Sequence, residues 1–265
     1  MEDIRDLIFS NIYDKKFKAL LTAEKDGILS GVNEAIKTAS DLCVEIEMFY
    51  KEGDKISQGD VLAEISGTPK QITMAEDRII GCLSKYSGIS TATARAVALA
   101  DGKVKIVSGS MKKMPSQMKF STKIAIESGG GECRISKTPM VYLDKNYIKM
   151  LGSIKKALKS VESRTDLVKV IQIKGLDGTI EEETLNAIEN GCNILMVDTG
   201  NIDDLKRCLQ VLESYGIRKN FEVAFAGGVK IDDIPGLCEY GIDSLCIGKE
   251  IVDALLLDMK LDVQI

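Results

Sequence analysis

Residues Val223-Ala-Phe-Ala-Gly-Gly-Val-Lys-Ile-Asp-Asp-Ile234 and Ile242-Asp-Ser-Leu-Cys-Ile-Gly248 each combine a short apolar run with glycine at its end. This pattern is typical of two buried strands that each lead into a helix. A β/α barrel uses two such units near its C-terminus to hold a phosphate, because glycine lets backbone amides approach a ligand. Tight turns without a ligand have the same pattern. We expect β/α units here, with a phosphate site at Ala226, Gly227, Gly228, Gly248 and Lys249.

From about residue 104 onward, short apolar runs alternate with amphipathic helical patterns. The expected strands are Val104–Val107, Met140–Leu143, Val168–Ile173, Ile194–Val197, Val223–Ala226 and Leu245–Ile247. The expected helices include Tyr147–Val161, Ile180–Asn190, Ile202–Tyr215 and Ile231–Tyr240. This alternation predicts parallel strands covered by helices. Six strands are too few for a closed eight-stranded barrel, so either the barrel is incomplete or the sequence hides one or two strands.

The first hundred residues follow a different pattern. Helical periodicity over residues 32–42 precedes a strand pattern over residues 44–50, and the steps Gly53-Asp54 and Gly59-Asp60 fit turns of an antiparallel sheet. We therefore expect fold class α/β. An α+β domain over residues 1–101 precedes an incomplete β/α barrel over residues 102–265, whose C-terminal helix can pack back on the first domain.

Composition narrows the classes of function. The chain has 265 residues and a net charge of −5, which argues against nucleic acid as the main partner. No apolar run approaches the roughly 20 residues that span a bilayer, so we expect no membrane partner. Seven cysteines without a CxxC pair indicate reduced thiols in a cytoplasm. The chain has no histidine, which disfavours a transition-metal site and removes the usual proton-transfer side chain.

Two further segments can carry chemistry. Ser87-Gly-Ile-Ser-Thr-Ala-Thr93 is small and hydroxylated, and a tight helix–helix contact is its simpler explanation. The second segment, residues 108–134, follows the first barrel strand at the face where loops build active sites. Its Gly129-Gly-Gly131 indicates unusual dihedral angles or close ligand approach. Its cations can line an anion site or can be solvated surface groups; they are Lys112, Lys113, Lys123 and Arg134.

Taken together, the chain resembles the quinolinate phosphoribosyltransferase family (nicotinate-nucleotide pyrophosphorylase), with some ModD-like character. The resemblance covers nearly the whole chain and implies an N-terminal sandwich domain before the barrel. The residues that carry it are Gly27-Ile-Leu-Ser-Gly31, Gly53-Asp54, Gly59-Asp60, Ala75-Glu76, Ser87-Gly-Ile-Ser-Thr91, Lys112, Pro115, Gly129–Gly131, Arg134, Asn146, Asp198, Gly227-Gly228 and Gly248.

The resemblance implies transfer of a phosphoribosyl group from phosphoribosyl pyrophosphate to quinolinate, with decarboxylation to nicotinate mononucleotide, in NAD biosynthesis. It implies Mg²⁺ at the leaving group, no organic cofactor, small anionic substrates and a homodimer. Lys112 and Asp198 are the implied catalytic residues, with Asp198 as a weak Mg²⁺ ligand. The implied substrate-binding residues are Arg78, Lys113, Cys133, Arg134, Lys145, Gln172 and Lys174.

This chain departs from the family pattern where the substrate cations should lie. The family's Arg-Lys pair is Met111-Lys112 here, and its His-Arg pair is Cys133-Arg134. Asp144 stands where the family has a lysine, with Lys145 adjacent, and Tyr147 stands where it has a histidine. Asp77 stands where the family has an arginine, with Arg78 next. Gln172 and Lys174 stand where the family has two acids. Three hypotheses stay open: the family's own reaction, the same chemistry on another acceptor, and a non-catalytic nucleotide- or phosphate-binding homologue.

Overall fold

The computed structural model describes residues 3–265, which divide into two compact units. The first comprises Met1–Arg95, Met111–Gly131 and Ile251–Ile265, and the second comprises Ala96–Ser110 and Glu132–Glu250. Each unit has its own principal sheet and apolar cluster. The domain boundary expected between residues 101 and 102 stays a prediction, because compactness alone does not define a folding domain.

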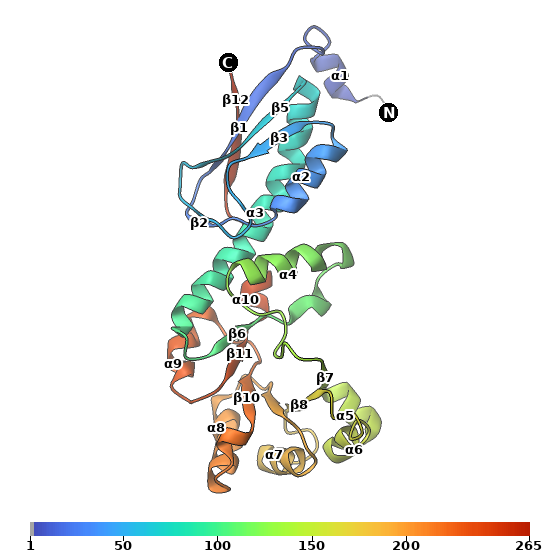
Figure 1. Cartoon of the computed structure of the whole chain (residues 1–265), viewed down its shortest axis with the longest axis vertical. Coiled ribbons are helices and arrows are strands. Elements are labelled where there is room, and N and C mark those ends of the chain that lie inside the picture. Colours follow the sequence, from blue (N-terminus) through green and yellow to red (C-terminus); the bar gives the residue numbers. More distant parts are fainter. Residues whose placement is uncertain (1–2) are drawn as a thin grey trace. The chain divides into compact units, whose positions relative to one another are not determined.

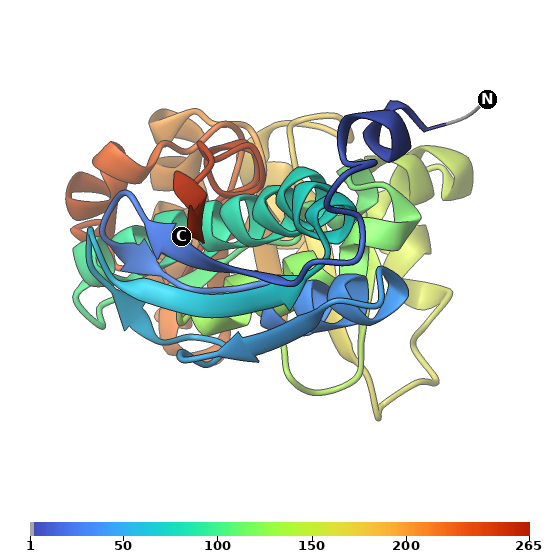
Figure 2. The ribbon, with the colours of Figure 1, turned by 90° about the horizontal axis from the view of Figure 1, so that it is seen from above.

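A four-stranded antiparallel sheet forms the first unit, in the order β12-β1-β5-β3. Its strands are β1 (Phe17–Ala23), β3 (Glu45–Met48), β5 (Val61–Gly67) and β12 (Met259–Gln264), and a separate pair joins β2 (Gly27–Ile28) to β4 (Lys55–Ile56). Alternate residues of β1 are buried, and α2 (Val32–Asp41) and α3 (Pro69–Ala100) pack against the sheet (Figures 1 and 2). Gly53 and Gly59 have φ of +87° and +93°, as turns require. The expected α+β domain is confirmed.

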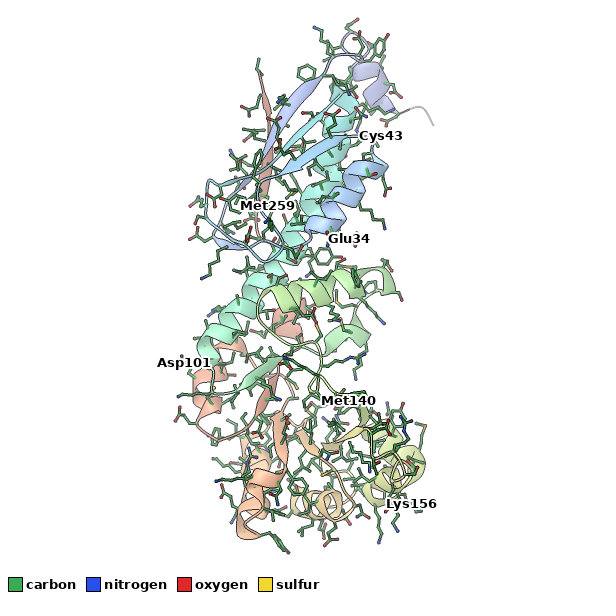
Figure 3. The ribbon with its side chains drawn as sticks, viewed as in Figure 1. Glu34, Cys43, Asp101, Met140, Lys156 and Met259 are labelled. Carbon is green, nitrogen blue, oxygen red and sulfur yellow. The ribbon has the colours of Figure 1, made fainter. Side chains whose placement is uncertain are left out.

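The end of the chain joins this sheet as a strand, where we expected a helix. β12 pairs antiparallel with β1, from Lys18 opposite Gln264 to Ala23 opposite Met259. Met259, labelled in Figure 3, is buried, whereas Lys260 is exposed. This period of two fits a strand with one covered face.

A tight contact explains the small residues of α3. Gly129 and Gly131 follow α4 (Lys119–Ser128), and a Cβ on either glycine would lie 2.6 Å from a side-chain carbon of Thr93. Gly130 has a φ of +82°. Thr93 is itself buried and donates a 2.8 Å hydrogen bond to the carbonyl of Ile89. The glycine triplet is therefore explained by close packing and backbone conformation within the first unit.

A six-stranded parallel sheet in the order β6-β11-β10-β9-β8-β7 forms the second unit. The strands are β6 (Lys105–Val107), β7 (Met140–Leu143), β8 (Val168–Ile173), β9 (Ile194–Val197), β10 (Glu222–Phe225) and β11 (Ser244–Cys246). Each lies within one residue of its predicted position. A single parallel bridge between Val107 and Glu132 continues the sheet beyond β6. The expected incomplete β/α barrel is confirmed.

Helices follow the strands, and two expected helices are each divided. The stretch expected as one helix over residues 147–161 forms α5 (Lys145–Leu151) and α6 (Ile154–Lys159), because Gly152 ends the first at a φ of +94°. The stretch expected over residues 231–240 forms the 3₁₀ turn η4 (Ile231–Asp233) and α9 (Ile234–Cys238). The remaining helical segments are α1 (Ile4–Ile8), η1 (Ser110–Lys113), η2 (Ser116–Met118), α7 (Ile180–Glu189), α8 (Ile202–Ser214), η3 (Arg218–Asn220) and α10 (Lys249–Val252).

One face of each strand in the parallel sheet packs beneath these helices. Ile171, Leu195 and Val223 are fully buried on that side, and α7 and α8 cover it with buried residues such as Ala187 and Leu212 (Figure 1). Over residues 3–265, no helix has the length and apolar character that crossing a membrane requires.

Candidate active site

The inner face of the half-barrel is apolar along the strands and polar at their carboxyl ends. Because side chains alternate, Val170, Ile194 and Met196 point to the face opposite the covering helices, where they form a cluster. Gln172 and Asp198 continue the same alternation at the carboxyl ends of β8 and β9. This is the edge at which parallel β/α sheets bind their ligands.

Gln172 links the ends of three neighbouring strands. The side chain is 5% exposed, and its Nε2 donates a 2.5 Å hydrogen bond to Oδ2 of Asp198. Its Oε1 accepts a 2.6 Å hydrogen bond from the amide of Lys145, at the start of α5. Both ends of the amide are therefore used, which fixes Asp198 relative to the loop after β7.

Lys174 supplies a positive charge next to the same aspartate. Its Nζ donates to the backbone carbonyl of Asp198 and lies 3.9 Å from Oδ2 of the carboxylate. The two side chains are about one-third exposed, at 33% and 30%. Gln172, Lys174 and Asp198, which the sequence predicted as site residues, thus come together. Within the described residues, Oδ1 of Asp198 has no recorded donor.

A buried glutamate shapes the loop that carries Lys174. Glu183 on α7 is 2% exposed, and its carboxylate accepts four backbone hydrogen bonds of 2.5 to 2.8 Å. The donors are the amides of Lys174, Gly175, Leu176 and Asp177. Sequence analysis did not identify Glu183. The available signal was a charged residue on the helix face that also holds Ile180, Thr184 and Ala187, all of which are buried.

A thiol and a phenol near Asp198 are held neutral. Burial raises the pKa of the Cys246 thiol to about 12, and the nearby Asp198 carboxylate adds to this effect. Burial, with a smaller contribution from Asp198, also raises the pKa of Tyr142 far above its ordinary value. A protonated thiol and phenol therefore border the carboxylate at neutral pH.

The glycine turn after β10 brings two loops into backbone contact. Gly227 and Gly228 have φ of +109° and +84°, and both are exposed. The amide of Gly200, after β9, donates a 2.9 Å hydrogen bond to the carbonyl of Ala226. In the described part of the chain, the amides of Gly227 and Gly228 donate no recorded hydrogen bond. They are therefore free to bind an anion, although the predicted phosphate site stays a prediction.

The helices after the two glycine turns are shorter than the sequence suggested. Only the turn η4 and the five-residue α9 follow Gly228, and α10 has four residues, beginning at Lys249. Gly248 is half-buried and Lys249 is exposed. Helices this short have weak dipoles, so binding at these turns would depend on individual amides.

The remaining predicted residues of the second unit are Cys133, Arg134 and Lys145. Glu132 exchanges hydrogen bonds of 2.8 and 2.9 Å with Ser108 and Ile106, which fixes the start of the segment that holds Cys133 and Arg134. Arg134 is exposed, and Cys133 is half-buried. Lys145 is also exposed, at the first position of α5.

Three of the cations that the resemblance assigns to the site belong to the first unit. Lys112 and Lys113 are exposed in η1, and Arg78 is exposed on α3. Asp77, beside Arg78, forms a 2.6 Å ion pair with Arg5. Because these residues and Asp198 belong to different units, their convergence on one cavity stays a prediction.

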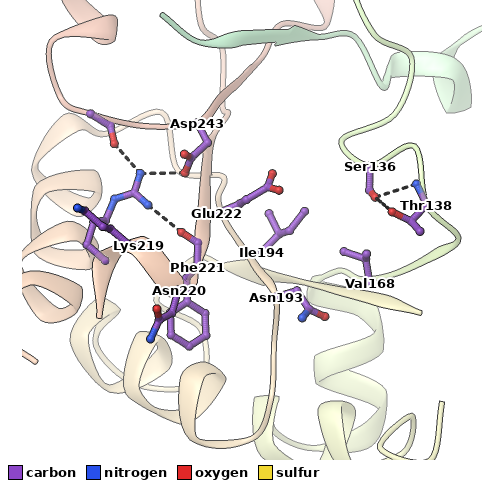
Figure 4. Close-up of a pocket in the computed structure, with 12 residues that line it drawn as sticks. Ser136, Thr138, Val168, Asn193, Ile194, Lys219, Asn220, Phe221, Glu222 and Asp243 are labelled. Carbon is purple, nitrogen blue, oxygen red and sulfur yellow. Dashed lines mark hydrogen bonds and ion pairs between the residues drawn. The ribbon is translucent and has the colours of Figure 1, made fainter. Parts of the chain in front are cut away.

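A cavity of about 730 Å³ lies at the opposite end of the parallel strands (Figure 4). Its lining includes Val168, Ile194 and Glu222, which stand at or near the amino ends of their strands, and no predicted site residue. Arg218 at this cavity is already bound to Asp243 at 2.8 Å and to two backbone carbonyls. Its charge is therefore committed to structure. An active site at the carboxyl ends stays a prediction.

The protein side chains at the carboxyl edge do not fit a bound Mg²⁺. Over residues 3–265, no group of three histidine, cysteine or acidic side chains is placed to hold a metal ion. Mg²⁺ requires oxygen ligands in octahedral geometry. Asp198 instead receives an amide hydrogen from Gln172 and lies beside the ammonium of Lys174.

Comparisons with known proteins agree with this architecture. The model of the quinolinate phosphoribosyl transferase C-terminal domain matches residues 89–262, and that of the N-terminal domain matches residues 4–87. A probable nicotinate-nucleotide pyrophosphorylase (carboxylating) of Archaeoglobus fulgidus is 28% identical over 252 residues, covering 94% of this chain and 95% of the relative. Its counterpart in Methanothermobacter thermautotrophicus is 24% identical over 249 residues, covering 92% and 87%.

Solved structures show the same fold. The nicotinate-nucleotide pyrophosphorylase from Francisella tularensis superposes with a TM-score of 0.82 at 22% identity, covering 98% of this chain and 90% of that one. The enzyme of the same name from Ehrlichia chaffeensis gives a TM-score of 0.82 at 20% identity, covering 99% and 92%.

Proposed function

Because the chain belongs to the quinolinate phosphoribosyltransferase family, we propose that it transfers a phosphoribosyl group to quinolinate in NAD biosynthesis. The donor is phosphoribosyl pyrophosphate. The ring nitrogen of the acceptor forms a bond to C1 of the ribose as pyrophosphate leaves. The carboxylate next to the ring nitrogen is then lost as CO2, and a proton takes its place on the ring to give nicotinate mononucleotide. The observation that carries the proposal is the match of both domain models to one chain that keeps Asp198 at the carboxyl edge.

The described geometry supports roles for three groups in this reaction. Oδ1 of Asp198 can accept a hydrogen bond from a sugar hydroxyl, because its Oδ2 is the atom that Gln172 binds. The amides of Gly227 and Gly228 can donate to a phosphate, since both residues are exposed and neither amide donates a hydrogen bond within the described part of the chain. The fixed loops position these donors and acceptors in advance, which is the main way such a site accelerates group transfer between anions.

Lys112 and Arg134 supply the positive charge that the two anionic substrates need. Both are exposed side chains in the described structure, so neither is committed to the core. We assign Lys112 to catalysis and Arg134 to substrate binding, with Lys113, Lys145, Arg78 and Cys133 as further binding residues.

Mg²⁺ enters this proposal as part of the donor. The phosphate oxygens of the donor would hold the ion, in keeping with the preference of Mg²⁺ for phosphates and one or two carboxylates. When bound, it would supply charge neutralisation at the leaving pyrophosphate. The protein's own contribution is to orient the donor and to exclude water.

A second acceptor class is favoured by the negative charge at the start of α5. Asp144 caps α5 through a 2.9 Å hydrogen bond from the amide of Asn146, so a carboxylate stands where the family has a lysine. A diacid such as quinolinate meets this extra negative charge, whereas a pyridine monocarboxylate meets less repulsion.

We also propose that the chain acts as a homodimer in the cytoplasm. The seven cysteines are all free thiols, in keeping with a reducing compartment. Large apolar side chains remain exposed on α5, where Met150 is 75% exposed and Tyr147 is 49% exposed. Light scattering should give twice the monomer mass, and a monomer at micromolar concentration would contradict the dimer.

An acceptor panel tests the proposed function. The full chain is incubated with phosphoribosyl pyrophosphate, Mg²⁺ and either quinolinate or nicotinate, and the mononucleotide product is measured by chromatography. Product from quinolinate supports the first proposal, and product only from nicotinate supports the second. Binding of the donor without product from either acceptor contradicts catalysis and leaves a nucleotide- or phosphate-binding homologue.

Variants locate the site in the same assay. Asp198→Asn should lower the turnover rate by about 100-fold, because it removes charge at the reacting sugar. Lys112→Ala should abolish product formation. Asp101→Asn is the matched control, since Asp101 is exposed with a φ of +48°, a conformation that asparagine also adopts. Unchanged turnover in Asp198→Asn or Lys112→Ala would contradict the placement of the site.

A further inference from the structure

Asp198 has an unusual set of partners for a carboxylate at the edge of a β/α sheet. Its Oδ2 receives the Nε2 hydrogen of Gln172 and lies 3.9 Å from the Nζ of Lys174, which also donates to the backbone carbonyl of Asp198. One ammonium is therefore held against two oxygens of a single residue. Both side chains are two-thirds covered, so water screens the charge pair only partly.

The fixed backbone around Lys174 holds its ammonium in place. A free surface lysine loses rotamer freedom when it is fixed. Here the backbone of Lys174 is fixed before the side chain is placed, because the buried Glu183 carboxylate accepts its amide at 2.6 Å and the amides of the three residues after it. Lys174 thus leaves the sheet in one direction, toward Asp198.

These contacts occupy the place that a divalent ion would take. A metal ion on Oδ2 of Asp198 would meet the amide hydrogens of Gln172, which are hydrogen-bond donors and not metal ligands. The Oε1 of Gln172 cannot serve as a ligand in their place, because it already accepts a hydrogen bond from the amide of Lys145. The ion would also be repelled by the ammonium of Lys174. Hard cations such as Mg²⁺ and Mn²⁺ need several oxygen ligands, and this edge offers them hydrogen-bond donors instead.

We propose that Lys174 is the resident counter-ion of Asp198 and replaces a divalent metal ion on that carboxylate. Asp198 consequently binds its substrate as an ion-paired acceptor. Lys174 is a specificity-determining residue of the site, because it sets the charge that a ligand meets at the ends of β8 and β9. The statement about substrate rests on the proposed function, whereas the statement about metal does not.

Mn²⁺ without substrate is the probe that tests the proposal. Free Mn²⁺ is measured by electron paramagnetic resonance as the full-length protein is titrated, because the signal of the hydrated ion falls on binding. Wild type and Asp198→Asn should bind equal amounts of Mn²⁺. Lower binding by Asp198→Asn than by wild type would overturn the proposal, because Asp198 would then be a metal ligand beside its lysine.

A variant that lacks the Lys174 ammonium is the second part of the test. Lys174→Met keeps the aliphatic stem and should raise the Mn²⁺ association constant by about tenfold or more. The double variant Lys174→Met/Asp198→Asn should lose that gain. Lys149→Met is the matched control, because Lys149 is exposed on α5, and it should bind as wild type does. No gain in Lys174→Met, or an equal gain in Lys149→Met, would overturn the proposal.

The Mn²⁺ binding result can be distinguished from a loss of folding and from a loss of enzymatic activity. Circular dichroism and thermal melting verify that each variant is folded, and if Lys174→Met does not fold, the comparison of wild type with Asp198→Asn decides the question by itself. Because no substrate is present, a chain that fails to form nicotinate mononucleotide can still satisfy or contradict the counter-ion proposal.

Discussion

The amide of Gly200 and the backbone of Gly227 lie in direct contact, so the loops after β9 and β10 meet without any side chain between them. A Cβ on Gly227 would overlap the amide nitrogen of Gly200 and lie 2.8 Å from its Cα. Gly227 also has a φ of +109°, which L-residues rarely adopt. This contact aligns the glycine turn with the end of β9, where Asp198 lies.

Gly227→Ala should therefore destabilise the protein by about 2 kcal/mol or more, through backbone strain and overlap with Gly200. Urea denaturation measures the change. Gly236→Ala is the control, because Gly236 lies in α9 with open space around the position of a Cβ, and alanine favours a helix. Equal stability of Gly227→Ala and Gly236→Ala would show that the two loops do not depend on this contact.

Glu183→Gln should destabilise the protein by about 2–4 kcal/mol, because the new NH2 group would face backbone donors that now share a carboxylate. Its partners are the four amides of residues 174–177. Glu189→Gln, an exposed change on the same helix, should alter stability by less than about 0.5 kcal/mol. Urea denaturation compares them, and similar losses in both variants would contradict the structural role of Glu183.

Gln172→Glu should make stability depend on pH. The new carboxyl would lie against Asp198 in a buried position, so its folded pKa would rise above its unfolded value. Stability would be retained where the new group is protonated and lost as pH rises through the folded pKa. The unfolding free energy relative to wild type should fall as pH rises above about 4.3, the ordinary pKa of glutamate. Gln210→Glu, an exposed change on α8, should show no such fall.

Buried thiols should lower stability at alkaline pH. Burial raises the pKa of Cys192 from 9.0 to about 12, so the folded state holds this proton more tightly than the unfolded state does. The contribution of the protonated thiol to the free energy of unfolding is complete below pH 9. It is lost as pH rises toward 12, by about 1.4 kcal/mol per pH unit. Cys192→Ala should flatten the alkaline limb of the stability curve. Cys43→Ala, at an exposed thiol, should match wild type, and identical curves for all three proteins would contradict the assignment.

Local patterns were sufficient to predict the parallel sheet. The apolar runs at residues 168–173 and 194–197 match β8 and β9 residue for residue, because buried parallel strands are apolar on both faces and end sharply at turns. The strand β12 was missed, since its structure depends on pairing with β1 more than 230 residues earlier in the chain. The helix expected over residues 147–161 was divided at Gly152, which sequence analysis had not treated as a helix end.

The candidate site was predictable where it depends on strand period and adjacency. Gln172 lies on one face of β8, Lys174 follows the strand in the same alternation, and Asp198 directly follows the neighbouring β9, so their contact follows from alternation and strand order. Their partners could not be predicted in the same way. Glu183 reaches backbone amides, which have no sequence signature, and the joint placement of Lys112 with Asp198 depends on an arrangement of units that local patterns do not encode.

The central claim is phosphoribosyl transfer to quinolinate, and its most direct measurement is the release of labelled CO2 from carboxyl-labelled quinolinate. The purified chain is incubated with Mg²⁺, with and without phosphoribosyl pyrophosphate. Release of CO2 that requires the donor, in a one-to-one ratio with nicotinate mononucleotide, is the predicted result. The absence of labelled CO2 under conditions in which the protein is folded and binds the donor would contradict the claim.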